Sequence, residues 1–163
     1  MNLVAGAPQW LIIVLAILLV AAAAQDAAKL KISNLLVLAV LLGGVVSAVL
    51  SGPRFEIWQN LALFALFIAI GIPLFATGKL GGGDVKLLAA VGFWYDFQSA
   101  LGLLLAVVIA GGILALVMVS LRMVRWSEKA RERIIVLQPR KGIPYAIAIA
   151  AGALMTIIAQ RGL

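Results

Sequence analysis

Long apolar runs separated by short polar stretches dominate this sequence of 163 residues. Because a helix needs about 20 residues to cross the hydrocarbon core of a bilayer, short loops leave no space for a soluble domain beside the helices. Only 12% of the residues are charged, against about 25% in soluble domains. The sequence therefore predicts an all-α polytopic membrane protein with a single domain over residues 1–163. Six candidate spans, of which the fourth is short and preceded by glycines, are Trp10 to Ala24, Ile32 to Ser51, Trp58 to Ala76, Val85 to Trp94, Ala100 to Leu121 and Ile143 to Ala159.

The distribution of Lys and Arg predicts the orientation of these spans. The loops after the first, third and fifth spans, with the start of the fourth, carry eleven of the thirteen basic residues, and the opposite side carries only Arg54 and Arg161. The positive-inside rule places the basic loops in the cytoplasm and both termini outside. The longest polar stretch, residues 122–141, is predicted to be a cytoplasmic connector with a short amphipathic helix around Ser127 to Leu137 and Trp126 at the interface.

The net charge of +7 then reflects the orientation of the chain, and the basic residues can also contact the anionic lipid of the bilayer. Nucleic-acid binding is not expected, because the basic residues flank apolar spans without interleaved aromatics on which bases could stack. The chain also contains no Cys and no His, which excludes thiolate and histidine nucleophile pairs and His-containing metal sites. We expect no metal and no cofactor.

Two of the six acidic residues are the candidates for chemistry. Asp26 lies sixteen residues after Trp10, a helical distance of about 24 Å, which is less than the hydrocarbon core of about 30 Å. Asp84 lies twelve residues before Asp96, a distance of about 18 Å if the segment is helical. A carboxylate within the membrane costs about 2.5–3.5 kcal/mol on insertion scales, so such a residue normally faces protein or water and has a function.

Each aspartate also has a purely structural interpretation. Asp26 could end the first helix at the interface with Lys29 as its partner. For Asp84, the preceding Gly81 to Gly83 could be a flexible loop, but three glycines before a short apolar run favour irregular, closely approached backbone that enters the membrane. Backbone of that kind is tolerated at membrane depth only against protein or a water-filled cavity.

Two carboxyl groups that meet near one membrane face can share a proton, as in aspartic proteases. One carboxylate then takes a proton from water while the other, protonated, polarises the scissile carbonyl. A membrane aspartyl hydrolase is the favoured chemistry. The alternative is a small carrier or structural component that uses Asp26 and Asp84 as a proton relay. A Ser-Lys protease is disfavoured, because neither Ser47 nor Ser120 is evidently paired with Lys86.

Three segments resemble motifs of the type IV prepilin peptidases. Gly81-Gly82-Gly83-Asp84-Val85-Lys86-Leu87 resembles their GxGD-x-K-L segment. Asp26 followed by Ile32-Ser33-Asn34 resembles their first aspartate and its Ile-Pro-Asn stretch. Pro144-Tyr145-Ala146 and the following apolar residues resemble their last helix, which begins Pro-Tyr-Gly. Two residues depart from the family pattern, since Ser33 stands where proline is usual and Ala146 where glycine is usual. Both departures concern local helix geometry and not the chemistry.

The resemblance implies that Asp26 and Asp84 are the catalytic pair of a leader peptidase in the inner membrane of a bacterial or archaeal cell. The implied substrate is a prepilin or pseudopilin, which has an N-terminal leader, cleaved after glycine at the cytoplasmic face, and a hydrophobic helix. The short form looks most like the peptidases of Flp (Tad) pilus systems, so N-methylation is not expected. The oligomeric state stays open. Residues expected to shape the site or contact substrate are Gly81, Gly83, Lys86, Asn34, Pro144 and Tyr145.

Some of these residues also have structural interpretations. Lys86 should not point at the partner of Asp84, because two residues correspond to about 200° around a helix, and it could be a snorkelling anchor. Pro144 and Tyr145 could simply begin a helix at the interface. Presenilin-like proteases share GxGD but have their Tyr-Asp pair on the preceding helix. Here Tyr95-Asp96 follows the glycines, which indicates an interfacial aromatic and a solvated acid.

Overall fold

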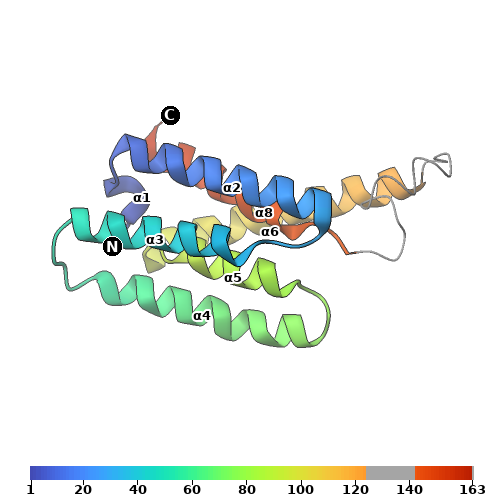
Figure 1. Ribbon diagram of the computed structural model, residues 1–163, viewed down its shortest axis with the longest axis horizontal. Helices are drawn as coiled ribbons and strands as arrows, with labels where there is room; N and C mark the ends of the chain where they lie inside the picture. Colours follow the sequence, from blue (N-terminus) through green and yellow to red (C-terminus); the bar gives the residue numbers. More distant parts are fainter. Residues whose placement is uncertain (124–141, 163) are drawn as a thin grey trace.

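A computed structural model of the protein describes residues 1–123 and 142–162, and within these residues it is all-helical. The helices run roughly parallel or antiparallel to one another in one bundle (Figure 1). The helices of the described ranges are α1 (Leu3–Gly6), α2 (Gln9–Lys29), α3 (Asn34–Leu50), α4 (Ile57–Ala76), α5 (Gly82–Gly92), α6 (Phe97–Met123) and α8 (Tyr145–Arg161). The predicted connector over 122–141 falls almost entirely outside the described residues, as does its amphipathic helix.

Each of the six predicted spans coincides with one helix, from α2 to α8. Among the described helices, α2, α4 and α6 are long and apolar enough to cross a bilayer, whereas α3 and α8 are shorter apolar helices of 17 residues. The 11 residues of α5 correspond to only about 16 Å of helix. The all-helical class is thus confirmed, and the number of crossings stays a prediction.

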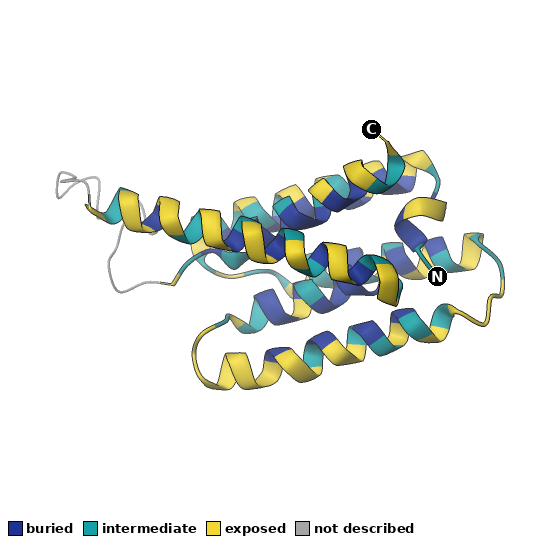
Figure 2. Cartoon of the chain, turned by 180° about the vertical axis from the view of Figure 1, so that it is seen from behind, coloured by how far each residue is buried: buried dark blue, intermediate teal, exposed yellow. Residues whose placement is uncertain are grey.

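Large apolar side chains cover the outside of the bundle. Exposed residues recur along the outward faces of the helices, while buried residues face the bundle axis (Figure 2). On α6, for example, Val108 and Leu116 are exposed and Leu103 is fully buried. A monomeric soluble protein rarely exposes such continuous apolar surface, so this surface suits contact with lipid.

The two ends of the bundle differ in charge. The α2–α3 and α4–α5 loops lie at one end, and the α3–α4 loop and both termini lie at the other (Figure 1). The first end, which we call the basic end, carries Lys29, Lys31 and Lys79, whereas Arg54 and Arg161 lie at the opposite end. The predicted grouping of the loops is therefore present in the fold.

The short helix α1, which has no counterpart among the predicted spans, fills the space beyond the end of α5. The backbone nitrogens of Leu3 and Val4 donate hydrogen bonds of 2.9 and 3.3 Å to the carbonyl of Trp94, just after α5. At the other end of the chain, Arg161 donates hydrogen bonds to the carbonyls of Val4 and Ala7. A four-residue helix has too few turns to show a hydrophobic period, which explains why the sequence pattern did not predict it.

The expectation that Tyr95 is an interfacial aromatic is wrong. Its side chain is fully buried, and its hydroxyl lies 2.8 Å from the hydroxyl of Thr156 on α8. The ring is enclosed because α1 and the turn after α5 extend the bundle beyond the short helix. The tyrosine hydroxyl needs a polar partner in such a position, and Thr156 supplies it.

Close contact between α6 and α8 depends on Gly152. A Cβ atom at this position would lie 2.6 Å from the backbone nitrogen of Val107, which cannot move aside as a flexible side chain could. Small residues of this kind let helix backbones approach each other in membrane proteins.

We therefore expect Gly152→Ala to lower the free energy of unfolding by about 1–3 kcal/mol, the usual cost of overpacking. Gly102→Ala on α6 is the matched control, because a Cβ there would meet nothing within 4 Å. It should leave stability unchanged or raise it by up to about 1 kcal/mol through helix propensity. Thermal unfolding in detergent measures both, and equal stability of the two variants would contradict the packing argument.

Candidate active site

Asp26 lies near the end of α2 that reaches the basic end of the bundle. Its side chain is buried, with 4% of its surface exposed. Oδ2 accepts a hydrogen bond of 3.1 Å from the backbone nitrogen of Ala146, 120 residues further along the chain. Within the described residues, its carboxylate has no ion pair with Lys29. The partner of this carboxylate is therefore a backbone N–H of α8, and not Lys29 as in the structural interpretation.

Asp84 lies in the first turn of α5, and 6% of its surface is exposed. Oδ2 accepts a hydrogen bond of 3.2 Å from the backbone nitrogen of Gly81, the residue that caps the helix. Oδ1 is buried and has no hydrogen-bond partner within the described residues. A buried carboxylate oxygen without a partner is costly, so it marks a position where water or substrate would be bound.

The expectation of irregular backbone is wrong for Gly82 and Gly83, because both are helical residues in the first turn of α5. The close approach that was expected does occur. A Cβ atom at Gly83 would lie 3.1 Å from Cβ of Ile32, and one at Gly82 would lie 3.3 Å from the ring of Phe75. The glycines thus let the helix start within a crowded space, and only Gly81 stays extended, with a φ of −72° and a ψ of 144°.

The beginning of α8 brings the two aspartates into one site. Pro144 caps this helix and is buried, and Tyr145 is its first residue. The next backbone nitrogen, of Ala146, reaches Asp26 and also interacts with the carboxylate of Asp84. Free N–H groups at a helix N-terminus stabilise negative charge. Pro144 and Tyr145 thus lie at the start of this helix, directly before the nitrogen that reaches Asp26.

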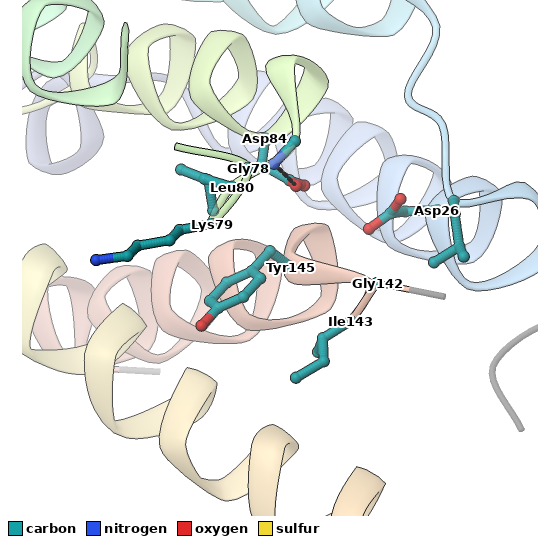
Figure 3. Close-up of a pocket in the computed structure, with 10 residues that line it drawn as sticks. Asp26, Gly78, Lys79, Leu80, Asp84, Gly142, Ile143 and Tyr145 are labelled. Atoms are coloured by element: carbon teal, nitrogen blue, oxygen red, sulfur yellow. Dashed lines mark hydrogen bonds between the residues drawn. The ribbon is translucent and has the colours of Figure 1, made fainter. Parts of the chain in front are cut away.

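Two adjoining cavities meet at the aspartates, and Asp26, Asp84, Gly81 and Leu30 line both. The first cavity, of about 400 Å³, extends between the Gly78 to Leu80 loop and the residues that precede α8. The second cavity, of about 260 Å³, extends between Ile32 and the glycines of α5. Figure 3 shows the two carboxyl groups pointing toward one another across the first cavity, with Lys79 and Tyr145 directed away from them.

The arrangement suits general acid-base chemistry on a bound carbonyl. The charges of the two carboxylates are close enough to interact, and two such charges in a poorly solvated space are not both ionised easily. The N-termini of α5 and α8 favour one negative charge in the same place. A pair that holds one proton has one group ready to accept a proton and one ready to donate.

The other predicted site residues divide into two groups. Gly81 and Gly83 line the cavities, and Tyr145 lines the first cavity. Lys86 and Asn34 instead bind each other, with Nζ donating to Oδ1 at 3.2 Å, beside a separate groove between α3 and α4. As expected, Lys86 does not share the partner of Asp84. It is exposed at the start of α5.

Sequence reasoning missed Leu30 and the backbone donor at Ala146. Leu30 ends α2 in the left-handed conformation, with a φ of 50°, and it lines both cavities. Leucine rarely adopts this conformation, so an unusual backbone position adjoins the site. No residue pattern indicates a left-handed leucine, and a backbone N–H is present at every residue but proline. Neither feature had a signal in the sequence.

Asp96 is excluded from the site by its position beyond the far end of α5. It is half-buried, and its Oδ1 accepts hydrogen bonds from the backbone nitrogen and the hydroxyl of Ser99. Burial raises the pKa of this carboxyl, but the hydrogen bonds from Ser99 outweigh that effect and hold the pKa below its usual value. Asp96 is therefore an ionised group that caps the start of α6.

Comparison with known families gives one match. The model of the type IV leader peptidase family matches residues 13–116, a range that contains both Asp26 and Asp84 and ends before α8. The searches of curated proteins and of solved structures gave no match.

Proposed function

Because this chain belongs to the type IV leader peptidase family, we propose that it hydrolyses prepilin leaders with Asp26 and Asp84 as its catalytic pair. The proposed substrate is a prepilin or pseudopilin of the Flp (Tad) type, cleaved after a glycine at the cytoplasmic face of the membrane. The observation that carries the proposal is the burial of two carboxyl groups, from separate helices, against one cavity at the basic end of the bundle.

In the proposed mechanism the pair holds one proton at the start. The ionised carboxylate takes a proton from water, and the resulting hydroxide oxygen bonds to the scissile carbonyl carbon. The carbonyl oxygen receives the proton of the other carboxyl, which leaves a tetrahedral intermediate. The C–N bond then breaks as the leaving nitrogen takes a proton from the first carboxyl, while one hydroxyl of the intermediate returns its proton to the second carboxylate. This step releases the amine and the carboxylic acid and restores the pair with its single proton. The pair titrates as a unit, so neither aspartate is assigned alone to either role.

Coexpression with a candidate prepilin tests the proposal directly. Mass spectrometry should find a mature pilin whose new N-terminus begins directly after the glycine of the leader. A proton-relay carrier would instead transport protons or solute and leave the prepilin intact. Intact prepilin in the presence of the folded protein would refute the peptidase proposal.

Activity is expected to be independent of metal, because two carboxyl groups suffice to activate water. The purified protein in detergent should cleave a prepilin equally well before and after exhaustive chelation with EDTA and dialysis. If activity were lost and then restored by a stoichiometric divalent cation, carboxylate-bound metal hydrolysis would replace the proposed mechanism.

Cysteine labelling tests the proposed orientation, and the natural absence of cysteine makes it simple. Thr77→Cys, in the exposed loop at the basic end, should react with a membrane-impermeant maleimide only after the cytoplasmic side is opened. Gln98→Cys, exposed at the opposite end, should react in intact cells. Labelling of both residues from the same side would contradict the proposed topology.

A further inference from the structure

A groove on the lipid-facing side of the bundle leads to the site from the membrane. Helices α3 and α4 follow each other in the chain, yet they make few contacts with each other, and α5 packs against both. Helix α5 forms the floor of the resulting space between α3 and α4 (Figure 1). We call it the α3–α4 groove. In its half nearer the basic end, it is lined by Val37, Leu38, Leu41, Phe64 and Ile68, with Asn34 and Lys86 at its end.

A second hollow, of about 740 Å³, lies toward the other end of the bundle and shares no lining residue with the first. It is lined by Val45 and Val49 of α3, by Ile57 of α4 and by the loop between these helices. On α3 the lining residues recur every three or four positions, so they form one stripe along the helix. The 17 residues of α3 correspond to about 25 Å, close to the thickness of the hydrocarbon core. The apolar stripe of α3, which lines both hollows, is therefore long enough to lie along a membrane-spanning helix.

The floor of the groove is held rigidly by close helix contacts. A Cβ atom at Gly71 of α4 would lie 2.3 Å from the side chain of Val85, and one at Gly92 of α5 would lie 2.4 Å from the ring of Phe67. On the α3 side, the indole nitrogen of Trp94 donates a 3.0 Å hydrogen bond to the carbonyl of Val40. Since α5 is fixed to both walls, closing the groove would require these contacts to break.

At the basic end, the groove adjoins the second cavity of the site. Asn34 and Lys86 mark the end of the groove, and Ile32, two residues before Asn34, lines the cavity with Gly83 and Asp84. A peptide that leaves a helical conformation here needs new partners for its backbone groups. Lys86 has three donors, of which Asn34 engages one, so this pair can meet an unwound peptide at the edge of the membrane.

The geometry points to the α3–α4 groove as the docking site for the apolar helix of the substrate. The inference rests on the proposed function, in which the leader precedes an apolar helix. With that helix in the groove, the chain passes Lys86 and Asn34, the scissile bond lies between Asp26 and Asp84, and the leader occupies the first cavity beside Lys79. The groove thus fixes the direction of the substrate and selects proteins whose cleavage site directly precedes a membrane helix.

Cross-linking tests the direction. The probe is a designed prepilin with a polar leader ending in glycine and an apolar helix of about 20 residues, with one cysteine in either part. In an Asp84→Asn background, Leu38→Cys in the groove should form a disulfide with a cysteine in the probe helix, and Lys79→Cys with one in the leader. Ile113→Cys, on the exposed face of α6, is the control and should form neither. Preferential cross-linking at Ile113, or of the leader to Leu38, would overturn the inference.

Kinetics separate this inference from the proposed function. Leu38 and Ile113 are both exposed apolar residues, at 49% and 59%, so tryptophan is tolerated by the fold at either position. Leu38→Trp should raise KM about tenfold for the designed prepilin, because the ring obstructs the groove. It should leave cleavage of a short soluble peptide without the apolar helix unchanged. Ile113→Trp should change neither.

The outcomes are distinct. If the unaltered protein cleaves both probes but Leu38→Trp affects them equally, the groove is not the docking site and the peptidase function stands. If the unaltered protein cleaves neither probe, the proposed function fails and the docking site fails with it. A disulfide between the Leu38→Cys residues of two copies without probe would show that the groove joins copies of this chain, which also overturns the inference.

Discussion

Replacing either Asp26 or Asp84 by asparagine is expected to abolish leader cleavage while the bundle still folds. Asparagine keeps the shape of the side chain and one acceptor oxygen, but it carries no charge and exchanges no proton. The cleavage rate should fall by about 10⁴-fold or more, since both the acid and the base depend on the pair. The double variant should be no worse than either single variant, because residues that act as a unit are strongly non-additive. Prepilin cleavage on gels and thermal unfolding in detergent measure activity and folding.

Two acidic residues at the opposite end of the bundle serve as controls for this prediction. Asp96→Asn keeps the acceptor that caps α6, and Glu56→Gln changes an exposed residue. Both variants should cleave at nearly the normal rate. If Asp84→Asn kept substantial activity while Asp96→Asn lost it, the site would have to be placed at the other end of α5.

The second large effect is expected on stability, at Asn60 of α4. This fully buried side chain donates hydrogen bonds to the carbonyls of Phe93 and Tyr95, at 2.8 and 3.0 Å, and to that of Met1. It thereby ties the turn after α5 to α4 and to the start of the chain. Asn60→Leu leaves these carbonyls without their donor, and each buried unsatisfied group costs about 1–3 kcal/mol. The free energy of unfolding in detergent should therefore fall several times further than it does for an ordinary surface substitution.

Gln98→Leu is the matched control for the change at Asn60, because Gln98 is exposed at the same end of the bundle. Its effect should stay within about 0.5 kcal/mol. Equal unfolding temperatures of Asn60→Leu and Gln98→Leu would mean that the carbonyls of Phe93 and Tyr95 find other donors. In that case Asn60 does not hold the end of α5.

Sequence patterns were sufficient for the parts of this protein that depend on local composition. An apolar run long enough to cross a bilayer has few alternatives to a helix, because unpaired backbone groups are too costly in lipid. The six predicted spans therefore match α2 to α6 and α8. Asp26 and Asp84 also stood out locally, because acidic residues are rare within apolar runs. The family followed from motifs around the same residues and is confirmed by the match over residues 13–116.

Tertiary structure alone decided how these parts meet. The backbone nitrogen of Ala146 reaches Asp26 across 120 positions of the chain. The motif at Pro144 and Tyr145 placed this segment at the site, but it did not identify the N–H that makes the contact. Tertiary structure also decided α1 and the burial of Tyr95, which depend on the space left beyond the short α5. The groove between α3 and α4 exists because α5, later in the chain, packs against both. Hydrophobic periodicity records which side of a helix is buried, but it does not record which other helix covers it, since burial is non-directional.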